Sequence, residues 1–119
     1  MGKDQRPRYL THQGACLAEP LQGIAIVLLE FDEQKRAATL EHRGLDFRHA
    51  AEVFAGPVFT LIDQREDYGE IRYLSYGRLG SRPVAIVWTQ RGEARRIISM
   101  RECHAKERRR FEHHLDRSG

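Results

Sequence analysis

Apolar residues gather in five runs along the chain, and each run has the β-branched and apolar composition of a strand. We predict strands over residues 23–31, 58–62, 71–79, 84–90 and 94–99. Turn residues separate the last four runs, at Tyr68-Gly69, Gly80-Ser81 and Arg91-Gly92. Because short connections join strands that run in opposite directions, the pattern predicts an antiparallel sheet.

Helical spacing occurs in two segments between the first and second predicted strands. Asp32 can cap a helix over residues 33–42, which ends near Gly44. A second short helix is indicated by apolar residues at positions i, i+3, i+4 and i+7, before Gly56-Pro57 stops it. Those residues are Phe47, Ala50, Ala51 and Phe54.

A third helix is predicted over residues 105–115, with Phe111 and Leu115 as its main apolar contacts. The order of elements predicts an α+β fold in which an antiparallel β-sheet packs against two N-terminal helices and a C-terminal helix. We assign residues 23–119 to this single domain. Residues 1–22 are polar and aperiodic, which is typical of a loose N-terminal extension.

Length and composition fit a globular domain of 119 residues, 40% of them hydrophobic and 31% charged. The longest apolar run, residues 24–29, is shorter than the roughly 18 to 20 residues of a membrane-spanning helix. Acidic residues follow this run where a signal peptide would need small ones. We therefore expect a cytoplasmic protein without a membrane partner.

The two cysteines, Cys16 and Cys103, lack the paired Cys and His spacing of a structural zinc site. In the cytoplasm both are expected to stay reduced. The sequence accordingly predicts neither a metal nor a cofactor. Among the histidines, His42 and His49 lie beside the first two predicted helices and are the better candidates for chemistry.

Charge is distributed unevenly, although the net charge is only +3. Residues 30–70 hold 5 basic and 10 acidic residues, whereas residues 71–119 hold 12 basic and 5 acidic ones. Most basic residues are arginines, whose planar guanidinium suits bidentate contacts to phosphate. A polyanionic partner is one interpretation, and a solvated arginine-rich surface is the other.

Two segments carry candidate chemistry. The predicted loop 63–70 combines acids, a base and a phenol, which fits either a site or a polar hairpin loop. In and just after the predicted strand 94–99, regular alternation places Arg95 on one face with Ser99, and Arg96 on the other face with Met100. Arg96 is either a phosphate ligand or a structural ion pair.

Several motifs together resemble the BrnT toxins of bacterial type II toxin-antitoxin systems, which belong to the RelE-like ribonuclease superfamily. The resemblance covers about residues 29–115, and its most specific parts are residues 67–70 and 96–101. The motifs are Phe31-Asp32-x-x-Lys35, Gly44-x-x-Phe47, Ala50-Ala51-x-Val53-Phe54, Asp63-x-Arg65-x-Asp67-Tyr68-Gly69-Glu70-x-Arg72, Gly77 and Arg96-Ile97-Ile98-Ser99-x-Arg101.

The resemblance implies a RelE-like fold, cleavage of messenger RNA and a BrnA-like antitoxin. In that family the antitoxin carries a ribbon-helix-helix segment, through which the complex binds operator DNA and represses its own operon. A hetero-oligomer of two toxins and two antitoxins is implied in the same way. Where the family usually reads Asn-x-x-Lys-His-Gly, this chain has Thr39-Leu40-Glu41-His42-Arg43-Gly44.

RelE-like cleavage implies attack of the RNA 2′-hydroxyl on the adjacent phosphate without a metal. It needs a base, cations that stabilise charge on phosphorus, and an acid for the leaving oxygen. The candidates are Glu70 or Asp67 as base, Arg65, Arg96 and Arg101 as phosphate cations, and Lys35 or Tyr68 as acid or positioning group. The alternatives are a catalytically inactive module that binds antitoxin and nucleic acid, and a metal-dependent nuclease.

Overall fold

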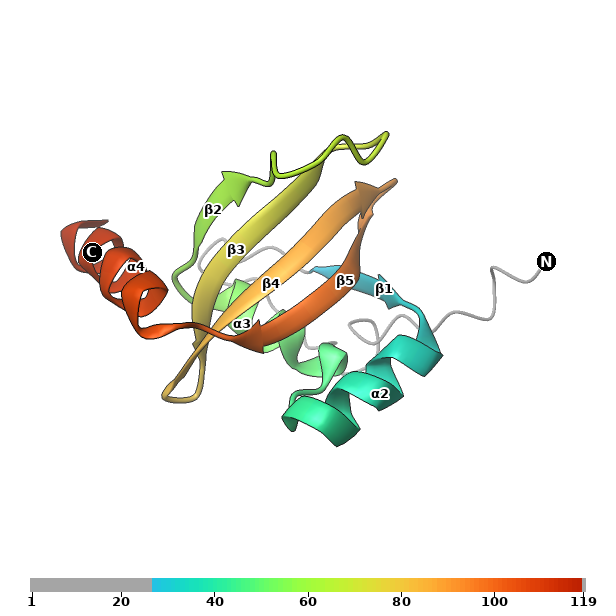
Figure 1. Ribbon diagram of the computed structural model, residues 1–119, viewed down its shortest axis with the longest axis horizontal. Coiled ribbons are helices and arrows are strands. Elements are labelled where there is room, and N and C mark those ends of the chain that lie inside the picture. The colour runs from blue at the N-terminus through green and yellow to red at the C-terminus, as the bar shows by residue number, and fades with distance from the viewer. Residues whose placement is uncertain (1–26, 119) are drawn as a thin grey trace.

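The computed structural model describes residues 27–118, and of residues 115–118 it describes only the backbone. Figure 1 shows a twisted sheet with helices on both of its faces and along one edge. The elements in chain order are β1 (Leu28–Phe31), α2 (Glu33–Arg43), η4 (Phe47–His49), α3 (Ala50–Ala55), β2 (Phe59–Ile62), β3 (Arg72–Leu79), β4 (Arg82–Arg91), β5 (Ala94–Glu102) and α4 (Ala105–Ser118). The fold is α+β, as predicted. The proposed extension over residues 1–22, the start of the first predicted strand at 23–26 and the side chain of Leu115 lie outside the described residues.

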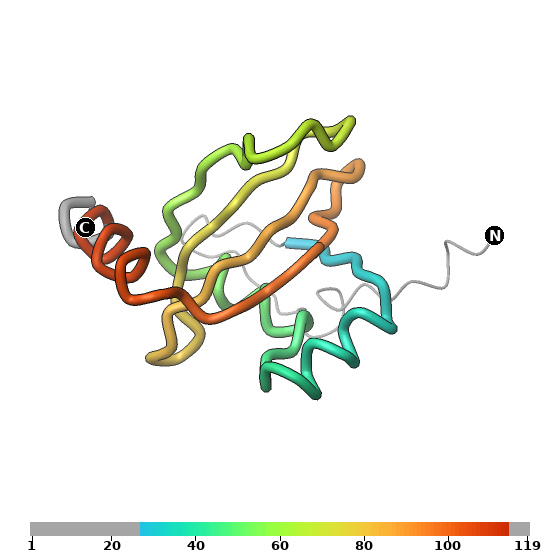
Figure 2. Tube along the Cα trace, viewed as in Figure 1, coloured from blue at the N-terminus to red at the C-terminus, as the bar shows by residue number. Residues whose placement is uncertain are grey.

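The sheet has the strand order β1-β5-β4-β3-β2. Strands β2 to β5 pair antiparallel with their sequence neighbours, as their short connections predict. The prediction of a wholly antiparallel sheet is wrong for β1, which pairs parallel with β5. Turn residues constrain the direction only of strands that a turn joins. Helices follow β1 in the chain, and β1 lies beside β5, the last strand in the sequence (Figure 2).

Helix α2 forms where capping residues predict it. The Asp32 carboxylate accepts hydrogen bonds from the backbone N–H groups of Gln34 and Lys35, and Gly44 adopts the left-handed conformation with φ 71°. The second predicted helix differs, because it opens as the 3₁₀ turn η4 and continues as the six-residue α3. Asp46 sets this turn by accepting from the backbone N–H of Arg48 at 2.9 Å.

The main core lies between one face of the sheet, called here the core face, and the segment η4–α3. Gly77 lets α3 approach β3 closely, since a Cβ there would lie 2.7 Å from Val53 Cγ1. Beside it, Trp88 Nε1 donates to Ser75 Oγ at 2.8 Å, which satisfies a buried hydroxyl. The buried apolar residues of this core are Leu29, Phe31, Leu45, Phe47, Ala50, Val53, Val84, Ile86, Trp88, Ile97 and Met100.

A β-bulge in β5 decides which residues share the second face of the sheet. Trp88 pairs with Ile97 but Val87 pairs with Ser99, so Ile98 is an extra residue in β5. The predicted grouping by simple alternation is therefore wrong beyond Ile97. Ser99 shares a face with Arg96, while Met100 returns to the core beside Ile97.

The second face is called the arginine face. The pairing register places on it Arg72, Leu74 and Tyr76 of β3, Ala85, Val87 and Thr89 of β4, and Arg96, Ser99 and Arg101 of β5. In Figure 1 this face is turned toward the viewer, with α3 behind the sheet, α4 at its left and α2 along the β5 edge. None of the helices within residues 27–118 has the length and apolar character needed to span a membrane.

Candidate functional site

A row of four polar residues crosses the arginine face from β1 to β3. In register, Glu30 lies opposite Arg96, Arg96 opposite Thr89, and Thr89 opposite Arg72. Two strand spacings separate the backbones of Arg72 and Arg96, which is roughly 10 Å. Two guanidinium groups on either side of a small hydroxyl residue form an arrangement suited to holding a phosphate between them.

Arg96 lies beside a buried carboxylate. Its Nη1 is 3.8 Å from Oε1 of Glu30, a residue that is only 6% exposed. Sequence reasoning identified Arg96 but missed Glu30, because a single acid at the end of an apolar run reads as the end of a strand. The negative charge of Glu30 orients Arg96, and a bound phosphate would compete with it for the same cation.

The loop between β2 and β3 brings Tyr68 and Glu70 to the β3 end of the row. The Arg72 guanidinium carbon lies 4.2 Å from the centre of the Tyr68 ring, and Arg72 Nε donates to Glu70 at 3.1 Å. Arg91, at the end of β4, lies 3.5 Å from the same carboxylate. Thr89 anchors the loop by donating its hydroxyl to the Ile71 carbonyl at 2.7 Å.

The remaining candidates of this loop contact other loop residues. Arg65 donates twice to Asp63, each time at 2.7 Å, and Tyr68 donates to the same carboxylate at 3.3 Å. The hydrogen bonds from Arg65 hold the pKa of Asp63 at about 2, although burial opposes this. Asp67 accepts from the Gly69 backbone N–H at 3.1 Å. Arg65 and Asp67 therefore shape the loop, and the structure does not bring them to the row.

An open groove between α2 and β5 places Lys35 and His42 beside the arginine face. Its lining includes Ile98 and Ser99, and Ser99 is three residues after Arg96 on β5. Arg43 fixes the end of α2 by donating to the Met100 carbonyl at 2.9 Å. The structure thus brings Lys35 close to the Arg96 part of β5 and adds His42 and Ser99, which sequence reasoning had not placed in the site.

Arg101 lies at the opposite end of the arginine face. Its two terminal nitrogens donate to the Glu107 carboxylate of α4 at 2.8 and 2.9 Å. The hydrogen bonds from Arg101 lower the pKa of Glu107 to about 2. With one bulged residue between them, Arg96 and Arg101 are four regular steps apart, or roughly 13 Å. A single phosphate therefore cannot lie next to the backbone of both Arg96 and Arg101. Arg101 belongs to a second part of the surface.

Two further groups complete the chemistry of the described residues. Burial raises the pKa of the Cys103 thiol to about 11, so this thiol is protonated at neutral pH and is a poor nucleophile. Cys16 lies outside the described residues. Within residues 27–118, no group of three His, Cys, Asp or Glu side chains is arranged to hold a metal ion.

A family model described as the ribonuclease toxin BrnT of type II toxin-antitoxin systems matches residues 31–107. The matched segment runs from the last residue of β1 into the first turn of α4, and it includes Arg72, Thr89 and Arg96. No curated protein matches the chain.

Proposed function

Since this chain belongs to the BrnT family of ribonuclease toxins from type II toxin-antitoxin systems, we propose that it is a metal-independent endoribonuclease with a RelE-like fold. The RNA 2′-hydroxyl attacks the adjacent phosphate, which leaves a cyclic phosphate and a free 5′-hydroxyl. The observation that carries this proposal is the row of Arg72, Thr89 and Arg96 across the sheet. Its two guanidinium groups would stabilise the additional negative charge on phosphorus.

Acid–base groups lie on both sides of this row. Glu70 lies at the loop end, beside Arg72, and is the proposed base for the 2′-hydroxyl proton. Lys35 and His42 lie on the other side, along β5 near Ser99, and one of them would protonate the leaving oxygen. An in-line displacement needs its base and its acid on opposite sides of the phosphate, which is the arrangement described here.

The other candidates have supporting roles in this proposal. Tyr68 positions Arg72 through its ring, and Arg65 and Asp67 hold the loop that carries Glu70. Arg101 contributes a second cation near α4. These roles predict smaller losses of activity on substitution than the loss of Arg96.

Membership of a type II toxin-antitoxin family implies a protein antitoxin as partner. We propose that this antitoxin is BrnA-like, with a ribbon-helix-helix segment that binds operator DNA. The complex would contain two toxins and two antitoxins and would act in the cytoplasm, where messenger RNA is available. Co-expression with the neighbouring reading frame, followed by co-purification and mass determination, tests the partner and the stoichiometry.

The central test is the loss of Arg96. We expect Arg96→Ala to reduce RNA cleavage by about a hundredfold to a thousandfold, because a charge-stabilising donor to the transition state is removed. Growth after induction and primer extension on cellular RNA are the measurements. Arg82→Ala is the matched control, since Arg82 is an exposed β4 arginine paired with Glu102 at 2.7 Å. A folded Arg96→Ala protein that still arrests growth would contradict the proposal.

One observation favours the inactive binding module as second candidate. Arg65, Arg96 and Arg101 each have a carboxylate partner in this structure, so phosphate must displace an existing ion pair. A non-catalytic module predicts unchanged RNA after incubation with folded, antitoxin-free protein. Cleavage that is lost with a chelator and restored by a divalent cation would instead indicate a metal-dependent nuclease.

A further inference from the structure

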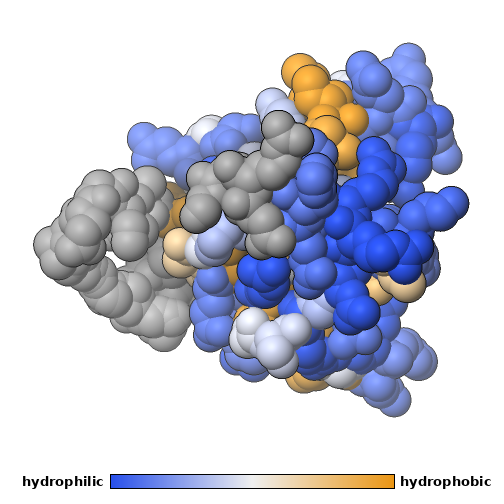
Figure 3. Space-filling view, turned by 90° about the vertical axis from the view of Figure 1, so that its left-hand side faces the viewer, coloured by the Kyte–Doolittle hydropathy of each residue, from blue (hydrophilic) through white to orange (hydrophobic). Residues whose placement is uncertain are grey.

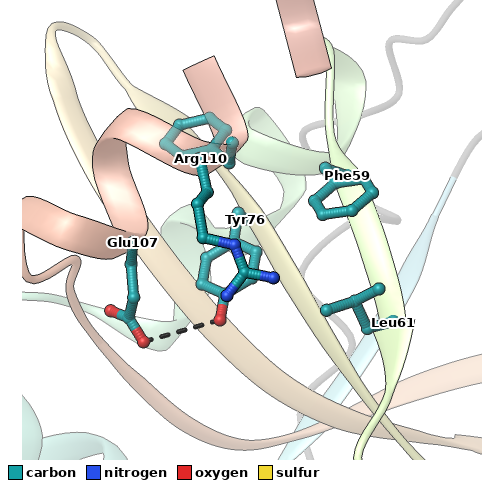
Figure 4. A pocket seen from close by; sticks show the side chains of 6 residues that line it. Phe59, Leu61, Tyr76, Glu107 and Arg110 are labelled. Carbon is teal, nitrogen blue, oxygen red and sulfur yellow. Dashed lines mark hydrogen bonds between the residues drawn. The ribbon is translucent and has the colours of Figure 1, made fainter. Parts of the chain in front are cut away.

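A pocket with an aromatic lining lies between α4 and the β2–β3 part of the arginine face. Figure 4 shows Phe59 and Leu61 on one side, Glu107 on the other and Tyr76 between them, with the Arg110 side chain of α4 drawn across the Tyr76 ring. Phe111 completes the lining. Tyr76 donates its hydroxyl to Glu107 at 3.5 Å. The site is therefore an aromatic slot whose lining also includes the polar side chains of Glu107 and Arg110.

The rings around this slot lie nearly parallel to one another. Phe59 and Tyr76 have centroids 6.4 Å apart at 20°, and Tyr76 and Phe111 have centroids 5.9 Å apart at 19°. Phe59 also stacks on His114 of α4, with ring centroids 4.0 Å apart. The slot encloses about 230 Å³ of empty space, part of it open to solvent. The enclosed cavity itself has a volume of only about 20 Å³, roughly the space of one water, so a planar ring can enter only when the exposed Arg110 side chain moves aside.

Charge on α4 identifies the kind of molecule that would carry such a ring. Of the exposed basic side chains of this helix, Arg110 lines the slot, and the others are Lys106, Arg108 and Arg109. Figure 3 shows that the side of the molecule with α4 and β2 is mostly hydrophilic, with its largest visible hydrophobic patch near the top. An aromatic slot beside clustered cations is the combination with which proteins bind single-stranded nucleic acid.

We propose that the slot between α4, Phe59, Leu61 and Tyr76 binds one nucleobase of single-stranded RNA. This inference rests on the proposed function, because the RNA would extend from the Arg72–Thr89–Arg96 row to α4. Arg101 lies between these two places, and it is roughly 13 Å from the Arg96 end of β5. The base would therefore belong to a nucleotide near the cut site rather than to the scissile one. Arg110 is exposed, so its side chain can move to admit the ring and contact the neighbouring phosphate.

The test uses 2′-O-methyl oligonucleotides, which this chemistry cannot cleave, with an abasic site placed at each position in turn. Fluorescence anisotropy measures their binding to the full chain. At one position, loss of the base should weaken binding by at least about fivefold. Leu61→Ala and Arg110→Gln should remove most of this dependence on the base. Cleavage of the corresponding RNA is measured in parallel.

Matched controls are available for both variants. Ile62→Ala alters the next exposed aliphatic residue of β2, which points to the other side of the strand. Arg109→Gln removes an exposed α4 charge outside the slot. Both controls should keep the dependence on the base.

The outcomes separate this inference from the proposed function. Binding that ignores abasic sites at every position, or a base dependence unchanged in Leu61→Ala and Arg110→Gln, would overturn the nucleobase slot even if RNA is cleaved. Loss of antitoxin binding in these variants, with base-independent RNA binding, would overturn it in favour of a protein side chain as occupant. A base dependence that follows the slot, without any RNA cleavage, would support the slot and contradict the nuclease.

Discussion

At the residue scale, the pair Arg101–Glu107 links the arginine face to α4. Both Glu107 oxygens accept from Arg101, and one also accepts from the His104 backbone N–H at 2.9 Å. A carboxylate with three charge-assisted or backbone donors strongly favours its ionised form, which explains its pKa of about 2. The cation that would meet RNA in this region is thus held by an acid of the same chain.

We expect Glu107→Gln to lower the free energy of unfolding at pH 7 by about 1 to 3 kcal/mol, because charged hydrogen bonds are lost. The folded pKa of Glu107 is depressed below its ordinary value near 4.5. Its contribution is therefore present above about pH 4.5 and is lost as pH falls toward about 2. The difference between wild type and variant should shrink over this interval when chemical denaturation is followed by circular dichroism.

The control for this variant is Glu102→Gln. Glu102 pairs with Arg82 at 2.7 Å, but its side chain is 54% exposed, so the pair should contribute less than about 1 kcal/mol. Equal destabilisation by the two substitutions would contradict the special role of Glu107. The Glu107→Gln variant should also bind single-stranded RNA more tightly, since it frees Arg101 from its carboxylate.

At the element scale, the bulge in β5 determines the composition of the arginine face. Because Ile98 is the extra residue at the bulge, Arg101 lies on the same face as Arg96, and Met100 lies in the core. Deletion of Ile98 would remove the extra residue and leave Arg96, Ser99 and Arg101 on the arginine face, with Ile97 and Met100 in the core. We therefore expect the deletion variant, like Ile98→Ala, to keep cooperative thermal unfolding. Loss of cooperative unfolding on deletion would contradict the assignment of Ile98 as the extra residue.

The sequence pattern predicts those features of the fold that interactions between neighbouring residues determine. The capping residues Asp32 and Gly44 predict α2, and turn residues predict the antiparallel order of β2 to β5. The parallel pairing of β1 and the bulge at Ile98 depend on partners distant in sequence, so strand composition does not encode them. For the same reason Arg96 was found from its motif, while its partner Glu30 and the groove position of His42 required the fold.

At the scale of the whole molecule, the uneven charge of the sequence becomes uneven in space. The basic segment 71–119 forms β3, β4, β5 and α4, which together make up most of the arginine face and the helix at its end. The acidic segment 30–70 forms α2, η4 and α3, beside β5 and behind the sheet (Figure 1), and also β2 and the loop that carries Glu70. A polyanion is therefore attracted to the face that carries the proposed site.

Salt dependence measures how many phosphates this face contacts. If Arg72, Arg96, Arg101 and Arg110 each neutralise one phosphate, log K for a single-stranded oligonucleotide should fall against log salt with a slope of about −3, because each contact contributes about −0.7. Arg110→Gln removes one of these contacts and should make the slope less steep by about 0.7. Arg48 lies in η4 and pairs with Asp46 at 2.7 Å. Arg48→Gln should leave the slope unchanged, because η4 packs on the core face. A slope near zero in the wild type would contradict phosphate binding by the arginine face, whereas an equal change for Arg48 and Arg96 variants would indicate diffuse attraction without a defined path for RNA.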